Sequence, residues 1–270
     1  MVATDKVFAG SIPEFYDRYL VPLIFESYAS DLATRIAGTT PRDVLETAAG
    51  TGVLTAAMTS CLPAETRIVA SDLNQAMLDH ASAKPALQDR VIWKQADAQA
   101  LPFDDATFDV VACQFGMMFL PDRIKGYSEA RRVLRPSGRF IFAVWDHISN
   151  NHFADVVTSS LTALFPQDPP MFLARTPHGH HDTARIGAEL SAAGLRNVSI
   201  ETIHHTSKAS SASDVAIAYC QGTPLRNEII ASDESGLEEA TRVATDALKK
   251  RYGNAEIEGL ISAHVITATI

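Results

Sequence analysis

Short hydrophobic runs alternate with amphipathic segments through the first half of this chain. The runs have the length of strands and lie at residues 44–46, 68–70, 91–93, 108–113 and 140–145. The segments between them carry apolar residues at helical spacing, for example in 54–61, 77–81 and 127–134. Strands that are apolar on both faces are typical of a buried parallel sheet. The pattern therefore predicts an α/β fold with helices on both faces of a parallel sheet.

The regions before and after this segment lack the regular alternation of strands and helices. Before it, Pro13 is expected to open a short helix, and Pro22 to begin a second helix that ends before Gly38. After it we expect a helix at 153–164, a long loop at 166–181, a helix at 186–193, a strand at 198–203, two or three helices within 212–252 and a last strand at 263–270. Ser235 and Glu238 form a capping-box pattern for the last of these helices.

This organisation indicates one domain over residues 1–270. Its core occupies about 40–146, and the insertions 147–190 and 207–258 are expected to join the N-terminal helices in a lid. The loop at 166–181 is rich in Pro, Gly and His, so we expect it to be mobile without a ligand and more ordered with one.

A glycine pair marks the first strand-to-helix turn. Gly50 and Gly52 in Gly50-Thr51-Gly52 would let the backbone approach a ligand closely, and the free amides of the following helix could receive a carboxylate or phosphate. Asp72 ends the second strand, where a carboxylate can accept the hydroxyl protons of a ribose. The alternative for Asp72 is a cap on the following helix.

The turn also narrows the choice of ligand. A dinucleotide fingerprint needs a third glycine or alanine at the position of Thr55, and a phosphate-binding loop needs a Lys-Ser/Thr pair that is missing here. No positive side chain lies in the turn, which suits a ligand without phosphates. S-adenosylmethionine is such a ligand, because it joins an adenosine to a zwitterionic amino acid through a sulfonium.

Four blocks of sequence resemble, in order, the motifs of class I S-adenosylmethionine-dependent methyltransferases. They are Glu46-Thr-Ala-Ala-Gly-Thr-Gly52, Ser71-Asp-Leu-Asn-Gln-Ala-Met-Leu78, Asp97-Ala-Gln-Ala-Leu-Pro-Phe103 with Phe108-Asp-Val-Val111, and Arg132-Val-Leu-Arg-Pro-Ser-Gly-Arg-Phe140. They cover residues 42–146 and are most similar to the ubiquinone/menaquinone-biosynthesis type. Asn74 departs from the pattern, since relatives often have Ser there.

The resemblance implies a set of cofactor contacts. Glu46, Gly50 and Gly52 would shape the pocket for the methionine part, and Asp72 would hold the ribose. Leu73 would lie against the adenine, whose edge Asp97 and Ala98 would bind. Gln114 would face the reacting methyl group, and Tyr16 would cover the cofactor. It also implies a Rossmann-like sheet of seven strands, mostly parallel, with an antiparallel last strand. The first and fourth strands should lie side by side at its centre.

The implied reaction is an SN2 methyl transfer from S-adenosylmethionine to a small-molecule acceptor. Such a transfer has no obligatory catalytic side chain, so the catalytic residues stay unassigned. Two alternatives remain: a protein that binds the cofactor without catalysis, and an NAD-dependent oxidoreductase. The apolar residues Phe165, Met171, Phe172 and Leu173 of the expected lid favour a hydrophobic or aromatic acceptor.

Composition excludes several other classes of function. The formal net charge is −9 and no Lys/Arg cluster is present, which argues against a nucleic-acid binder. The three cysteines form no zinc or disulfide pattern, and His178-Gly-His-His-Asp182 lacks the distant ligands of a metal site. Met1–Asp5 does not resemble a signal peptide and no apolar run has the length of a membrane span. We therefore expect a cytoplasmic protein that is not inserted in a membrane; a homodimer is one possible oligomeric state.

Overall fold

The computed structural model describes residues 12–233 and 235–270. The Met1–Asp5 segment, on which the absence of a signal peptide was judged, lies outside these residues. The chain divides into two compact units. The sheet unit comprises Glu26–Val144, His181–Ile203 and Ala263–Ile270. The helical unit comprises the described residues of three stretches: those up to Phe25, Trp145–His180 and His204–Ser262.

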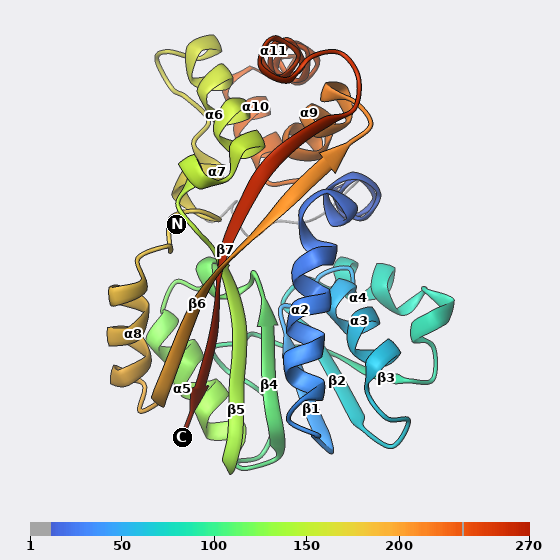
Figure 1. Cartoon of the computed structure of the whole chain (residues 1–270), viewed down its shortest axis with the longest axis vertical. Helices are drawn as coiled ribbons and strands as arrows, with labels where there is room; N and C mark the ends of the chain where they lie inside the picture. Colours follow the sequence, from blue (N-terminus) through green and yellow to red (C-terminus); the bar gives the residue numbers. More distant parts are fainter. Residues whose placement is uncertain (1–11, 234) are drawn as a thin grey trace. The chain divides into compact units, whose positions relative to one another are not determined.

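Seven strands form one sheet. They are β1 (Asp43–Thr47), β2 (Arg67–Asp72), β3 (Val91–Gln95), β4 (Phe108–Gln114), β5 (Leu134–Trp145), β6 (Arg196–Ala209) and β7 (Ile257–Thr269). Their order is β3-β2-β1-β4-β5-β7-β6 (Figure 1). The first five strands pair in parallel, and β1 and β4 are neighbours. The predicted α/β class, the parallel first five strands and the central β1–β4 pair are confirmed.

The direction of β7 can be followed from side-chain pairs across β6 and β7. Asn197 Nδ2 donates to Thr269 Oγ1 over 2.9 Å, and Thr202 Oγ1 lies 3.0 Å from His264 Nδ1. As the residue number rises by five on β6 it falls by five on β7, which is the signature of antiparallel strands. Figure 1 shows the arrow of β7 opposed to those of β5 and β6. The antiparallel last strand is therefore confirmed, and β6 forms the edge of the sheet beside it. Both strands are longer than the sequence predicted.

The sheet unit also contains five α-helices and two 3-10 turns among its described residues. These are α2 (Glu26–Ala37), α3 (Val53–Cys61), α4 (Gln75–Ser82), α5 (Arg123–Val133), α8 (Thr183–Ala192), η3 (Pro85–Leu87) and η4 (Met117–Phe119). Helices α2 and α3 pack together, as do α5 and α8 (Figure 1). The second pair is joined by Arg123, whose Nε and Nη2 each donate to Glu189 over 3.0 Å.

The core of the sheet unit contains large side chains from β5 and α5. Phe140 and Phe142 of β5 stack with ring centroids 4.6 Å apart, and both contact Tyr127 of α5. All three are fully buried. These contacts explain why the run at 140–145 forms a strand and why α5 covers it, since each aromatic ring removes a large apolar area from water.

The helical unit comprises α1 (Ile12–Phe15), the π-helix η2 (Tyr16–Phe25), η5 (Ile148–Asn150), α6 (His152–Leu164), α7 (Phe172–Arg175), α9 (Ala212–Gln221), α10 (Leu225–Ser232) and α11 (Leu237–Tyr252). Pro22 lies inside η2, so the prediction that it begins a second helix is wrong. Helical structure therefore continues through the proline, from η2 directly into α2.

Two further expectations for this unit need correction. Helix α11 is capped by Gly236 without a side-chain hydrogen bond, while Ser235 Oγ donates to Asp233, so the predicted capping box does not form. Helix α7 interrupts the expected loop at 166–181, and its Phe172 and Leu173 are buried rather than available to an acceptor. Gly253 follows the last residue of α11 with a φ of 100°, in agreement with the expected end of these helices at residue 252.

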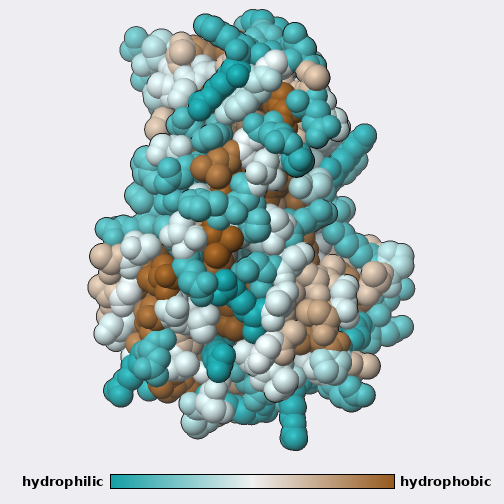
Figure 2. All heavy atoms as spheres, viewed as in Figure 1, coloured by the Kyte–Doolittle hydropathy of each residue, from teal (hydrophilic) through white to brown (hydrophobic). Residues whose placement is uncertain are grey.

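The surface shows no extended hydrophobic area on the face drawn in Figure 2, where hydrophilic residues predominate and the hydrophobic areas are small and separated. Leu73, Ile92, Ile124 and Met171 are the large hydrophobic residues that are exposed among those described. None of the described helices combines the length and the apolar character that crossing a bilayer requires.

Candidate functional site

The turn between β1 and α3 is built from residues in the left-handed region. Ala48, Gly50 and Gly52 have φ values of 53°, 55° and 82°. A Cβ at Gly52 would lie 3.2–3.3 Å from atoms of Ala81, Leu87 and Trp93, so glycine permits the close packing there. A Cβ at Gly50 would meet nothing within 4 Å among the described residues. Gly50 therefore leaves one side of the turn open to a ligand.

Asp72 connects this turn to the end of β2. Its Oδ2 accepts a hydrogen bond from the Gly50 amide over 2.9 Å, and its Oδ1 accepts one from the Asn74 amide over 2.8 Å. The N-cap of α4 is Asn74, so the alternative that Asp72 itself caps this helix is wrong. Oδ1 also accepts a longer hydrogen bond, over 3.4 Å, from the side-chain amide of Asn74. The capacity for a hydroxyl donor therefore lies mainly at Oδ2, which has a second lone pair beside the one that accepts the Gly50 amide.

Glu46 is a buried carboxyl at the end of β1. It is 1% exposed, and its Oε2 accepts a 2.6 Å hydrogen bond from the hydroxyl of Thr55 in α3. Burial raises the pKa of Glu46 to about 8; the Thr55 hydrogen bond opposes this rise and the charge of Asp72 adds to it. Burial also raises the pKa of Asp72, against the hydrogen bonds from Asn74 and Gly50.

Two buried carboxyls thus adjoin one open glycine turn: Asp72 accepts the amide of Gly50, and Glu46 is bound to Thr55 of the helix that follows the turn. Among the described residues, no Lys or Arg side chain is one of the main influences on the pKa of Glu46 or Asp72. A cation brought here would favour the ionised form of both groups, whereas a diphosphate would be repelled by them. The electrostatics therefore fit a ligand with cationic groups and hydroxyls, such as S-adenosylmethionine, better than a dinucleotide.

The next predicted residues extend from Asp72 towards β3. Leu73 is 44% exposed, which leaves its apolar side chain free to cover a flat ring. The amide of Ala96 donates to the carbonyl of Asp72 over 3.0 Å, and this contact places the following Asp97 and Ala98 beside the end of β2. Both are half-buried, and Asp97 Oδ1 accepts from the Gln99 amide over 2.8 Å.

Gln114 ends β4, the neighbour of β1. Its side chain is buried, and the chain turns sharply after it because Phe115 has a φ of 53°. A Cβ at Gly116 would come within 2.4 Å of Ala48 Cβ and 2.7 Å of Cys113 Sγ. The end of β4 is therefore in van der Waals contact with the turn that holds Gly50, and Gln114 belongs to the same edge of the sheet.

Tyr16 belongs to the helical unit, unlike the other predicted site residues. It lies in η2 and its ring stacks on Phe25 with centroids 5.1 Å apart. Its expected cofactor contact stays a prediction.

The histidine-rich segment has structural partners. His178 Nδ1 lies 2.8 Å from the carbonyl oxygen of Asp146, and Asp182 caps α8 by accepting hydrogen bonds from the amides of Ala184 and Arg185. Within residues 12–233 and 235–270, no group of three His, Cys, Asp or Glu side chains is arranged to hold a metal ion.

Sequence reasoning missed three residues that shape the site. Thr55 was noted only as an absent glycine, Asn74 as a departure from a motif, and Gly116 not at all. The spacing Asp-x-Asn at 72–74 does indicate the contact between Asp72 and Asn74, because an Asp carboxylate often accepts a hydrogen bond from the backbone amide two residues later. The role of Thr55 depends on its contact with Glu46 of β1, and that of Gly116 on its contact with Ala48 in the turn after β1; both contacts join different elements of the fold.

Comparison with known proteins agrees with this geometry. A model of the ubiE/COQ5 methyltransferase family matches residues 11–202. The chain is 33% identical over 174 residues to the ubiquinone/menaquinone biosynthesis C-methyltransferase UbiE of Idiomarina loihiensis, over 59% of this chain and 68% of that protein. It is 34% identical over 142 residues to a demethylmenaquinone methyltransferase of Deinococcus radiodurans, over 52% of this chain and 58% of that protein.

The fold has relatives among solved structures. It resembles the crystal structure of a SAM-dependent methyltransferase from Aquifex aeolicus with a TM-score of 0.51, over 72% of this chain and 90% of that one. At 17% identity this likeness shows the shared fold alone. The match of the family model shows membership of the family as well as a shared fold, because it covers most of this chain. The chain therefore belongs to the ubiE/COQ5 methyltransferase family, and it is an S-adenosylmethionine-dependent methyltransferase.

Proposed function

We propose that the methyl acceptor is an aromatic ring carbon of a reduced, quinone-type small molecule. The support is the naming of two relatives, one as a ubiquinone/menaquinone biosynthesis C-methyltransferase and one as a demethylmenaquinone methyltransferase. A hydroquinone has a nucleophilic ring carbon next to its hydroxyl group, and such a carbon can attack an electrophilic methyl group. The proposed acceptor is thus chemically matched to the methyl donor.

The observation that carries the proposed cofactor site is the pair of buried carboxyls around Gly50. We assign Asp72 to the ribose hydroxyls, because its Oδ2 retains a lone pair beside the open side of the turn. Glu46, Gly50 and Gly52 are assigned to the methionine part, whose ammonium group would favour ionised Glu46.

The remaining assignments follow the edge of the sheet. The exposed Leu73 would cover one face of the adenine, and Asp97 and Ala98 would bind its amino group and ring edge. Gln114, at the end of β4, would lie beside the transferred methyl group. Tyr16 is assigned to the cofactor by its place in the family pattern.

S-adenosylmethionine, when bound, supplies a methyl group on a sulfonium whose leaving group is a neutral thioether. The protein has then to align the acceptor carbon with this methyl group and to exclude water. Removal of the hydroxyl proton from the acceptor would assist the attack. We assign no residue to that step, since the chemistry requires no particular side chain.

We propose that the acceptor-binding surface includes segments of the expected lid at 147–180 and 207–258. These segments belong to the helical unit, whereas α8, which was counted in the first insertion, belongs to the sheet unit. Met171 is the exposed member of the apolar group that was expected to favour an aromatic acceptor.

The oxidoreductase alternative is not supported. The antiparallel β7 lies between β5 and β6, unlike the all-parallel continuation of a dinucleotide-binding sheet. Thr55 also fills the position of the third glycine with a side chain that is hydrogen-bonded to Glu46.

The test is a transfer assay with S-adenosylmethionine that carries an isotopic label in its methyl group. The acceptors are demethylated benzoquinols and naphthoquinols, simple phenols and primary amines, and the products are identified by mass spectrometry. We expect label on a ring carbon of a quinol. Label on oxygen or nitrogen would contradict the proposed acceptor, and cofactor binding without any turnover would support the non-catalytic alternative.

A further inference from the structure

A second cavity lies in the sheet unit, at the opposite end of the strands from Gly50 and Gln114. It has a volume of about 520 Å³. We call it the amino-edge cavity, and it is lined by Thr39, Thr40, Pro41, Arg42, Asp43, Asp109, Arg135, Ser137 and Arg139. Its volume falls within the range of about 300–1,000 Å³ that is common for small-molecule sites.

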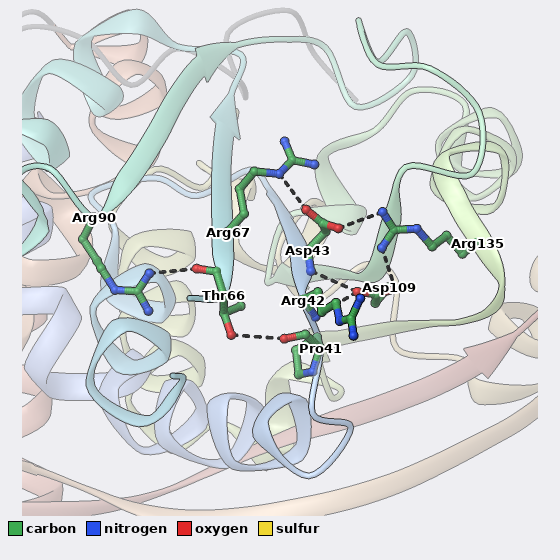
Figure 3. A network of polar contacts seen from close by, with 8 residues as sticks. All are labelled: Pro41, Arg42, Asp43, Thr66, Arg67, Arg90, Asp109 and Arg135. Carbon is green, nitrogen blue, oxygen red and sulfur yellow. Dashed lines mark hydrogen bonds and ion pairs between the residues drawn. The ribbon is translucent and has the colours of Figure 1, made fainter. Parts of the chain in front are cut away.

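The negative charges of the two carboxylates in this cavity are already balanced by arginine side chains. Arg135 lies between them and donates to Asp43 Oδ2 and to Asp109 Oδ1, each over 2.7 Å, while Arg67 donates to Asp43 Oδ1 over 2.6 Å (Figure 3). Asp109 Oδ2 accepts from the amides of Arg42 and Asp43 over 2.8 and 3.0 Å. Both acids are therefore occupied by donors, and a metal cation would have to displace an arginine to bind them.

The hydrogen bonds keep these carboxylates ionised. Burial would raise the pKa of Asp43 and that of Asp109, but Arg67 and Arg135 outweigh it at Asp43, and Arg135 with two amides outweighs it at Asp109, so both pKa values lie below their ordinary value. The two acids thus contribute two negative charges, which the guanidinium groups of Arg67 and Arg135 balance.

Two further arginines leave the cavity with an excess of positive charge. Arg42 and Arg139 are exposed, and no ion pair between described residues involves the guanidinium group of either one. Guanidinium groups bind phosphate oxygens in a bidentate manner, so a pair of them at the rim of a polar cavity is suited to an anion. This local excess occurs in a chain whose formal net charge is −9.

The backbone around the cavity is strained and tightly packed. Thr40 is β-branched and precedes a proline, yet it has a φ of 49°. At Gly138 a Cβ would lie 2.8 Å from Leu134 Cδ2 and 3.0 Å from the carbonyl oxygen of Asp109. Gly138 belongs to a segment that loops out of β5, since Leu134 pairs with Phe108 and Arg139 already pairs with Val110. This loop carries Arg135 and Ser137 into the cavity, and strain of the kind seen at Thr40 is often found at ligand sites.

We propose that the amino-edge cavity binds a phosphorylated small molecule whose phosphate group is held by Arg42 and Arg139. The hydroxyls of Thr40 and Ser137 are further donors on the lining. The remaining volume accommodates the body of the molecule, because a single phosphate fills only part of a cavity of this size. This site is separate from the methyl-transfer site and does not depend on the identity of the acceptor.

The experiment is isothermal titration calorimetry of the whole chain at low ionic strength. The probes are uridine 5′-monophosphate, uridine and inorganic phosphate, none of which contains the adenine that the cofactor site accepts. We expect uridine 5′-monophosphate to bind more tightly than inorganic phosphate, and uridine not to bind. This order separates a phosphorylated molecule from free phosphate as the occupant.

Variants connect the binding to the two arginines. The double variant Arg42→Ala/Arg139→Ala should weaken binding of uridine 5′-monophosphate at least tenfold, since each arginine would lose charged hydrogen bonds to phosphate. Arg196→Ala removes another exposed arginine, which lies outside the cavity, and should leave the affinity unchanged. Binding weaker than about 1 mM for every phosphorylated probe, or equal losses in the double variant and the control, would overturn the proposal.

Discussion

The hydroxyl of Thr55 donates a 2.6 Å hydrogen bond to the buried carboxyl of Glu46. Thr55 occupies the position at which a dinucleotide-binding turn has its third glycine, and it is completely buried. The residue that separates this turn from the dinucleotide pattern is therefore also the one that holds an acidic side chain of the site. A single position in α3 thus contributes both to ligand choice and to the geometry of Glu46.

We predict that Thr55→Val destabilises the protein more than Thr55→Ser. Valine has nearly the same shape but leaves a buried carboxyl without its donor, which costs about 1–3 kcal/mol, whereas serine keeps the hydroxyl. Chemical denaturation of both variants measures the difference in the free energy of unfolding. Equal stability of the valine variant and the wild type would show that this hydrogen bond contributes nothing.

The raised pKa of Glu46 predicts a stability that falls with pH. The carboxyl titrates near 4.5 in the unfolded chain and near 8 in the folded one. Its contribution to stability is therefore fully present below about pH 4.5 and is lost as the pH rises through about 8. Comparison of the wild type with Glu46→Gln cancels the other titrating groups. The wild type should lose stability relative to the variant between pH 5 and pH 8, and parallel curves would contradict the assignment.

Binding of the cofactor should depend on pH through the same group. If its ammonium group faces Glu46, binding favours the ionised form and releases a proton, so the affinity of the wild type rises as the pH rises towards 8. Glu46→Gln should lack this rise. Calorimetry in buffers with different ionisation enthalpies counts the released protons, and zero release in the wild type would exclude a cation next to Glu46.

Asp72→Ala should weaken binding of S-adenosylmethionine roughly ten- to a hundredfold, which is the scale of about 1.5–3 kcal/mol for hydrogen bonds to a charged group. The change removes acceptors for the ribose and also releases the amide of Gly50. Asp79→Ala is the matched control, since Asp79 lies on the exposed side of α4 and accepts from Gln75. If the affinity of both variants equals that of the wild type while the fold is intact, the ribose is bound elsewhere.

Gly116→Ala should lower the free energy of unfolding by about 1–3 kcal/mol, because its methyl group would overlap Ala48 and Cys113. The same substitution at Gly187, inside α8, meets no atom within 4 Å and should stabilise the helix by up to about 1 kcal/mol. Thermal unfolding of the two variants makes the comparison. A neutral Gly116→Ala would show that the ends of β1 and β4 can separate without cost.

The segment 166–181 is expected to exchange its amide hydrogens faster without the cofactor than with it. Most of its exposed residues, 166–168 and Met171, precede α7, while His178 and His180 are buried. Hydrogen exchange followed by mass spectrometry should place the protection by ligand in 166–171. Slow exchange over the whole segment in both states would rule out the expected ordering.

Local patterns predicted the central sheet well, because β1 to β5 are short apolar runs between helical segments. The direction of β7 could not come from periodicity, since a strand of alternating or apolar residues looks the same in both directions; it was predicted from the family resemblance. The sequence did not predict the place of Pro22, because proline is typical of the first turn of an α-helix and no residue pattern marks the π-helix in which it lies.

The residues of the site were predicted unevenly for a similar reason. Gly50 and Asp72 are marked by their positions at strand ends, which sequence can locate. The hydrogen bond between Thr55 and Glu46 and the contact of Gly116 with Ala48 join different elements. Such contacts depend on the register of β1, α3 and β4 in space, which no short pattern encodes.

The place of β7 between β5 and β6 has a consequence for the folding of this protein during its synthesis on the ribosome. β6 is translated well before β7, yet β7 separates it from β5 in the finished sheet. Until residues 263–269 leave the exit tunnel, β5 and β6 each present an open edge, a condition that invites mispairing. Assembly of this side of the sheet is therefore a late event in synthesis, and a nascent chain halted before β7 is a natural client for a chaperone.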